Sequence, residues 1–430
     1  TTLRGSVGLT YERLFYAVSQ FFQFSPNFGV PTLVAGTPLA GTGATIAPIP
    51  LINPGATVPS IFGPLGGTGT TVLPNFLARG IDRNLEAPRI TFWTLTLDRE
   101  IARNTIASLQ YAGAHGHDLF TVSNINRPGS ALAFLGDGFA DTARLNTTLG
   151  PIFFLRSNGR SNYNAFIADV TNSAWRTIGL QFTARYRFAK ALDNVNPFIN
   201  ENFNVGLLGT SFTTNQLSPF SPSGDYGPSD FDVRHRFIGS FIWEVPDFFN
   251  PSCCGGNGGW KRWLLSGWAV TGIFQAMTGF PFNVFDCAGA LTPETPCPRA
   301  LIAPGVNLGA IRTGQGTSVP DTTIPNRFNF LPASNFAIAP TTTVFPPFTG
   351  LSTVGRNFFR GPGFWNFDFG VYKRFRFSET TSFQLRGEFY NIFNHSNLFV
   401  PTAVDINSTN FVPAFRRGGR IVQVGGKFVF

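Results

Sequence analysis

The sequence predicts an all-β fold, an antiparallel transmembrane β-barrel of which about ten strands are present. Charged residues make up 13% of the chain, about half of the roughly 25% usual in soluble domains. Aromatic residues make up 15%, with 49 Phe among 430 residues. The apolar residues are nevertheless dispersed in short alternating pieces, and no run approaches the roughly 18 residues of a membrane-spanning helix. Long and short connections alternate between these pieces, which is typical of membrane barrels.

The C-terminal segment RIVQVGGKFVF (420–430) shows the alternation most clearly. Apolar or small residues occupy one parity, and polar residues or glycine occupy the other. Because side chains of a strand alternate between its faces, the segment has one apolar and one mixed face. Such a strand suits a closed barrel in lipid, where no backbone group can stay unpaired. We expect Phe428 and Phe430 to form the C-terminal signal for the barrel-assembly machinery.

The same period of two predicts the other strands. They fall at 3–11, 89–99, 105–114, 161–171, 177–190, 233–244, 264–278, 365–377 and 380–393. Long connections are expected at 12–88, 115–160, 191–232, 279–364 and 394–419, and shorter ones at 100–104, 172–176, 245–263 and 378–379. A sandwich or a propeller would not sort its connections in this way, although a secreted Phe-rich sandwich is the alternative fold.

Strand parity also places charged residues on the face away from lipid. We expect six of them to point into the lumen: Arg185, Arg187, Asp368, Arg386, Glu388 and Lys427. Cross-strand charge ladders are the favoured interpretation, and ligand contacts are the alternative. Lys373 breaks the pattern on the apolar side, which is tolerable only near the membrane interface. Trp93, Trp243, Trp268, Trp365 and Tyr111 could contribute to aromatic girdles.

The histidines and cysteines give weaker signals. His115 and His117 could share a strand face and permit a metal pair, but two ligands are too few for a typical site. His235 and His395 lie at predicted strand ends, where we expect hydrogen bonds at the rim. A disulfide between Cys287 and Cys297 is plausible in an oxidising compartment, while Cys253 and Cys254 are adjacent in a Gly-rich turn. No zinc pattern results.

No catalytic motif is present in the sequence. A GxSxG elbow, an HExxH motif and a P-loop are all missing, and the Gly-rich pieces at 41–45 and 66–71 are expected to be flexible loop. We therefore expect no enzyme activity and no cofactor. The net charge of +9 is scattered, which argues against nucleic acid. It fits a basic lumen or contact with outer-membrane lipid and lipopolysaccharide.

Six segments resemble the Oar-like TonB-dependent receptors of the bacterial outer membrane, a group common in Acidobacteria. They are TFWTLTLDREIARNTIASLQYAGAHGHDL (91–119), SNYNAF (161–166), SDFDVRHRFIGSFIWEVP (229–246), LLSGWAVTGIFQAMTGFPFNV (264–284), GRNFFRGPGFWNFDFGVYKRF (355–375) and FQLRGEFYNIFNHSNL (383–398). They occur in the family's order and cover most of the chain. Each segment alone is a modest signal, whereas six in order are specific.

The resemblance implies a 22-stranded barrel with an N-terminal plug. Residues 1–430 would then form a single domain, the C-terminal part of the receptor barrel, with the plug, the TonB box and the signal peptide before Thr1. It further implies energised uptake of an extracellular ligand through the TonB system acting on that plug. The alternative is a structural or adhesive outer-membrane barrel that displays long loops. The sequence does not name the transported substrate.

Overall fold

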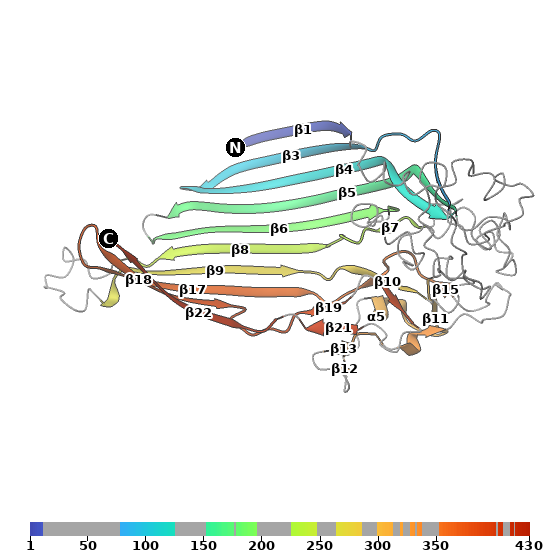
Figure 1. Ribbon diagram of the computed structural model, residues 1–430. Coiled ribbons are helices and arrows are strands. Elements are labelled where there is room, and N and C mark those ends of the chain that lie inside the picture. The colour runs from blue at the N-terminus through green and yellow to red at the C-terminus, as the bar shows by residue number, and fades with distance from the viewer. Residues whose placement is uncertain are drawn as a thin grey trace, which may run out of the picture.

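The part of the protein that the structure describes is built mainly from antiparallel β-strands (Figure 1). The computed structural model describes residues 1–11, 78–124, 152–175, 178–195, 225–246, 264–285, 299–312, 319–320, 327–331, 333–337, 352–400, 403–406, 413–416 and 418–430. No helix within these ranges is both long and apolar enough to cross a membrane.

One twelve-stranded sheet dominates the fold, and its main path joins neighbours in sequence. The path runs β1 (Thr2–Tyr11), β3 (Arg89–Ala102), β4 (Thr105–Asn124), β5 (Ile152–Trp175), β6 (Leu180–Asp193), β8 (His235–Glu244), β9 (Trp268–Met277), β17 (Phe364–Arg376), β18 (Ser382–Tyr390) and β22 (Ile421–Val429). Every pair along this path is antiparallel. Each of the ten strands expected from sequence coincides with one of these. Among the described residues no pairing joins β1 to β22, so the sheet is open between these edges.

Two further strands pair at the side of this path. The strand β2 (Ala78–Ile81) runs parallel to β5, and β7 (Gly227–Pro228) pairs with β6. The strand ends that border the long connections lie at one end of the sheet, on the right in Figure 1, and the strand ends that border the shorter ones lie at the other. The tightest short turn joins β3 to β4, where Asn104 adopts a positive φ of 59°. The alternation of long and short connections expected from sequence is therefore confirmed.

Two strands are much longer than expected. The strands β4 and β5 contain 20 and 24 residues, whereas roughly 9–11 tilted residues cross a bilayer. The expected bounds of 105–114 and 161–171 were therefore too short, mainly at the long-loop end and for β5 also at the short-turn end. Outside the bilayer a strand no longer has to present an apolar face, so the alternation that marks it in sequence fades there.

One face of the sheet is apolar across all ten strands, and we call it the apolar face. Cross-strand partners share a face, so the register traces it directly. One row runs Leu95, Tyr111, Phe166, Phe188, and another runs Phe274, Phe367. On the last strand Phe383 pairs with Phe428, and Leu385 pairs with Gly426. The opposite, mixed face carries the charged side chains.

Lys373 is the cation that sequence parity placed on the apolar face, and the structure shows how it is accommodated. It pairs with Trp268 at the short-turn end of β17 and is only 2% exposed. Its ammonium lies 5.4 Å from the Trp268 ring centroid and 5.1 Å from that of Phe375. It also donates a hydrogen bond to the main-chain oxygen of Ser266. Lys373 therefore lies near the end of the strand, as its sequence position requires.

The long connection expected at 279–364 contains a folded unit. Within this connection lie β10 (Pro281–Phe285), β11 (Leu301–Ile302), α5 (Leu308–Arg312), β12 (Val319–Pro320), β13 (Arg327–Asn329), η5 (Ala333–Asn335), β14 (Phe336–Ala337), β15 (Ser352–Thr353) and β16 (Phe359–Arg360). Three short strands that follow β18 pair with them directly or through one another: β19 (Leu398–Phe399), β20 (Ala403–Asp405) and β21 (Pro413–Arg416). They form three small sheets, of which β16-β10-β20 is central. The sequence predicts the long connection but not its internal strands, because these strands have two to five residues and leave no clear period in the sequence.

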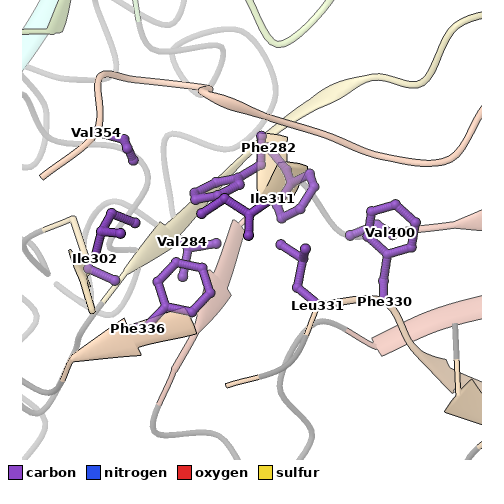
Figure 2. Close-up of a cluster of buried hydrophobic side chains, with 11 residues drawn as sticks. Phe282, Val284, Ile302, Ile311, Phe330, Leu331, Phe336, Val354 and Val400 are labelled. Carbon is purple, nitrogen blue, oxygen red and sulfur yellow. The ribbon is translucent and has the colours of Figure 1, made fainter. Parts of the chain in front are cut away.

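A cluster of buried hydrophobic side chains holds this unit together, and we call it the rim core (Figure 2). Its members are Phe282, Val284, Ala300, Ile302, Ile311, Phe330, Leu331, Phe336, Val354, Phe359 and Val400. The rings of Phe282 and Phe336 lie 5.6 and 5.5 Å from that of Phe359, centroid to centroid. The rim core therefore lies among the connections and not within the main sheet.

Candidate functional site

The mixed face of the main sheet brings the six charged residues expected in the lumen onto one side. On the last strands Tyr372 pairs with Arg386, Glu388 with Gln423, and Gln384 with Lys427. Asp368 pairs with Ile273 on β9, while Arg185 and Arg187 on β6 pair with Ile238 and Arg236 on β8. Following these pairs across the sheet places all six on the face opposite the apolar one. Their role as ligand contacts stays a prediction.

Two of the strand pairs on this face carry ion pairs. Arg185 forms one with Asp169, its direct cross-strand partner on β5. Arg4 forms another with Asp98, which also accepts a hydrogen bond from Ser108 Oγ at 2.6 Å. These contacts match the charge-ladder interpretation, because oppositely charged residues stand directly or diagonally opposite one another. Arg185 is thus already engaged within the sheet.

Asp368 is engaged with the backbone at the long-loop end of β18. Its Oδ1 accepts hydrogen bonds from Asn366 Nδ2 at 2.7 Å and from the Asn391 main-chain N–H at 2.9 Å. Asn391 has a positive φ of 51°. Its side-chain Nδ2 donates a hydrogen bond to the His395 main-chain oxygen, and its Oδ1 accepts one from the His395 main-chain N–H, each at 2.9 Å. Asp368 therefore fixes the point where β18 ends, which leaves its carboxylate less available to a ligand.

Glu388 has hydrogen-bond partners for its carboxylate, whereas in the part of the chain that the structure describes two arginines of this face, Arg187 and Arg386, have an Nε atom without one. Tyr372 and Tyr390 donate hydrogen bonds to the two carboxylate oxygens of Glu388, at 3.2 and 3.5 Å. The Nε atoms of Arg187 and Arg386 are buried and lack a hydrogen-bond partner among the described residues. A buried N–H without a partner costs about 1–3 kcal/mol. These two guanidinium groups are therefore the strongest candidates for contact with a further group.

At the long-loop end, a network of arginines and aspartates joins connections that are distant in sequence, and we call it the rim clamp. Arg356 donates from Nη1 to the main-chain oxygen and the carboxylate of Asp193, the first at 2.9 Å. Its Nη2 donates to the Val195 main-chain oxygen at 2.9 Å and lies 3.5 Å from Asp230 Oδ1. One side chain thus links the end of β6 with the segment around β7.

Arg360 completes the rim clamp four residues later. Its Nη1 donates to the Asp232 main-chain oxygen at 2.6 Å, and its Nη2 pairs with the carboxylate. Asp232 is 1% exposed and also accepts from the Ala191 main-chain N–H at 2.7 Å. Because the aspartate accepts from both the arginine and β6, it fixes β16 against the main sheet.

Asn357 and Arg299 extend the rim clamp. Asn357 exchanges hydrogen bonds with Asn283 of β10 at 2.6 and 2.7 Å and donates to the Pro228 main-chain oxygen at 2.8 Å. Arg299 donates to Asp225 at 2.6 Å. Burial lowers the pKa of Arg299, and the Asp225 carboxylate opposes that shift.

Sequence reasoning did not find the rim clamp. Four of its charged residues, Asp230, Asp232, Arg356 and Arg360, lie in the segments SDFDVR (229–234) and GRNFFR (355–360), whose net charges are opposite. This charge complementarity could have indicated that the two segments meet, but more than a hundred residues separate them in the sequence. Only the fold shows that they meet.

The histidines lie where the sequence placed them. His235 Nδ1 is 2.7 Å from Tyr186 Oη, and the His395 ring stacks on Trp365 with 4.2 Å between centroids. The rings of His115 and His117 are 4.0 Å apart, centroid to centroid. Within the described ranges no group of three or more His, Cys, Asp or Glu could hold a metal ion.

Further predictions concern the cysteines, the Gly-rich pieces and the C-terminal phenylalanines. Cys253, Cys254, Cys287 and Cys297, together with the Gly-rich pieces 41–45 and 66–71, lie outside the described residues. Phe428 lies on β22, and its ring centroid is 6.3 Å from that of Phe430. Their role as an assembly signal stays a prediction.

A sheet of long antiparallel strands with one continuous apolar face, short turns at one end and long connections at the other defines an integral β-barrel protein. The chain belongs to the outer membrane beta-barrel domain family, whose sequence profile matches residues 1–423. Its location is therefore the bacterial outer membrane.

Parts of several solved outer-membrane proteins are similar to this chain at very low sequence identity. The outer membrane transporter YddB from Escherichia coli is 12% identical with a TM-score of 0.41, over 83% of this chain and 34% of that one. The ferripyoverdine receptor of Pseudomonas aeruginosa is 10% identical with a TM-score of 0.39, over 80% and 28%. The FrpB iron transporter from Neisseria meningitidis is 12% identical with a TM-score of 0.35, over 81% and 32%.

This chain thus spans about a third of the length of these solved proteins. No curated protein matches it.

Proposed function

We propose that residues 1–430 are the C-terminal barrel portion of an Oar-like TonB-dependent receptor that takes up an extracellular ligand. The observation that carries the proposal is the mixed face, where Arg187 and Arg386 keep buried Nε atoms without partners in the described part of the chain. These groups suit contacts with a ligand or with a plug inside the barrel.

The rim clamp and the rim core support the same proposal. They hold β10 and β16 in a fixed position at the long-loop end. A ligand that arrives from outside would meet this ordered rim first and the charged residues of the mixed face afterwards. Arg187, Arg386 and Lys427 are the preferred ligand contacts, because Arg185, Asp368 and Glu388 are held by neighbouring groups.

The test is capture of the full-length gene product by the purified periplasmic domain of TonB. The protein is extracted from outer membranes in mild detergent, and an unrelated outer-membrane barrel from the same preparation is the control. We expect the receptor, but not the control barrel, to be retained, and to show the heat-modifiable mobility of a folded barrel on gels. A folded barrel that fails to bind TonB would overturn energised uptake and favour the structural or adhesive barrel.

A further inference from the structure

The apolar face carries a row of aromatic side chains across three neighbouring strands. Tyr111, Phe166 and Phe188 are successive cross-strand neighbours on β4, β5 and β6. Tyr186 lies two residues from Phe188, and all four side chains are exposed on the sheet. Aromatic rows of this kind mark the boundary between membrane and water.

The hydroxyl groups of the two tyrosines show on which side of this row the polar layer lies. Tyr111 Oη donates to Asn164 at 2.6 Å, and Tyr186 Oη lies 2.7 Å from His235 Nδ1. In the register Asn164 pairs with Gly113, and His235 pairs with Phe188. Both hydrogen-bond partners therefore lie two residues nearer the long-loop end than the tyrosines, on the same face. A tyrosine at an interface keeps its ring in the apolar layer and its hydroxyl in the polar one.

A basic patch begins directly beyond these hydroxyl groups, on the same face. Lys190 pairs with Asn164, and His115 pairs with both Thr91 and Asn162. One step further Arg89 pairs with His117. Arg160 shares the parity of Asn162 on β5. The basic patch thus comprises Arg89, His115, His117, Arg160 and Lys190, on four adjacent strands.

The charge of the basic patch selects an anion over a metal ion. The two neighbouring imidazoles offer a pair of nitrogen ligands, but Arg89 is the direct cross-strand neighbour of His117. The acidic neighbour, Asp118, forms an ion pair with Arg89 at 2.9 Å. Among the described residues of the patch, three permanent cations therefore stand against the one carboxylate that is paired with it. Such an excess repels a divalent metal and attracts phosphate.

We propose that the basic patch binds the phosphate groups of an anionic lipid in the outer leaflet of the membrane, with the aromatic row against its acyl chains. Arg160, Lys190 and Arg89 are exposed on the outward face, at the depth where headgroups begin. Lysine and arginine at such a surface attract anionic lipid, each by a few-fold in affinity. This inference does not depend on ligand uptake, because the basic patch lies on the face away from the lumen.

The test is retention of lipid A by the full-length protein. The protein is purified in a neutral detergent and titrated with diphosphoryl lipid A or with its dephosphorylated form, and bound lipid is measured by native mass spectrometry. We expect the diphosphoryl form to bind at least about tenfold tighter. Each of Lys190→Gln and Arg160→Gln should weaken it about fivefold, and the pair on the order of 25-fold.

The matched control is Arg185→Gln, which removes a cation from the opposite face of the same strand as Lys190. It should leave binding within about twofold of the unmodified protein, because its charge lies across the sheet from the lipid. Equal binding of the two lipid A forms would overturn the proposal. Equal losses in the control and in Lys190→Gln would do the same, and so would full competition by inorganic phosphate at equal concentration. Saturable Zn²⁺ binding lost in His115→Ala would assign the patch to a metal instead.

Discussion

The apolar face and the rim core use the same side chains in opposite environments. Phe359 of the rim core is 1% exposed and contacts the rings of three other phenylalanines. Phe166 of the apolar face is 45% exposed on the surface of the sheet. One phenylalanine is covered by protein, and the other is left for lipid to cover.

This difference separates the molecule into two parts with different sources of stability. The sheet is held by its hydrogen-bonded register, and its apolar side chains lose water only when lipid is present. The rim resembles a small soluble domain, with a hydrophobic core and buried ion pairs that protein alone encloses. A substitution should therefore affect one part without the other.

The largest effect is expected for Phe359→Ala in the rim core. Removing a fully buried ring lowers stability by about 3–5 kcal/mol. We expect that loss as faster hydrogen exchange in β10 and β16 of the full-length protein in vesicles, with heat-modifiable mobility retained. Phe166→Ala is the matched control and should leave exchange in the rim unchanged. If both variants loosened the rim equally, the division into two parts would be wrong.

A somewhat smaller effect, about 3 kcal/mol, is expected for Arg356→Ala in the rim clamp. The side chain of Arg356 is 10% exposed, and its loss leaves Asp193 and Asp230 without their cation, which is costly when the carboxylates are partly buried. Limited proteolysis of the rim provides the measurement, since released connections become accessible.

Arg185→Ala is the control for this substitution. Arg185 also pairs with an aspartate, but its side chain is 63% exposed, and exposed ion pairs contribute about 1 kcal/mol or less. Rim cleavage should stay at its original rate in this variant. Equal cleavage in the two variants would show that burial does not distinguish the two ion pairs.

The smallest effect, about 2 kcal/mol, is expected for Val371→Lys on the apolar face. Val371 lies two residues deeper than Lys373, or roughly 6–7 Å along the strand. A lysine there loses the cover that Trp268 gives Lys373 and faces the hydrocarbon, where it costs about 2–4 kcal/mol at midplane. The urea midpoint of folding into vesicles should fall, whereas Thr271→Lys on the mixed face should leave it nearly unchanged. Equal losses would mean that the two faces are assigned incorrectly.

Much of the sheet could be predicted from sequence because lipid imposes a strict pattern. Phe383, Leu385 and Phe389 alternate with Gln384, Arg386 and Glu388, and the register confirms both sets on opposite faces. The extensions of β4 and β5 beyond the bilayer could not be predicted in this way. There the pattern relaxes, and pairing with the neighbouring strand alone maintains the structure.

The candidate site was predicted only in part. Parity placed Arg187 and Arg386 on the mixed face, but it could not show that Arg185 and Asp368 would be held by other groups. Whether a charged side chain is paired depends on residues from neighbouring strands, whose register is not written in any single segment.

The sequence by itself determined the ten strands along the main path of the sheet, their two faces and the alternation of long and short connections, because each follows from a local period of two under the constraint of a lipid bilayer. Only the tertiary structure decided that Asp232 meets Arg360, that the rim core exists, and that Lys190 and Arg89 share one outward patch. These contacts join segments separated by many residues, and no local pattern encodes which of them become neighbours.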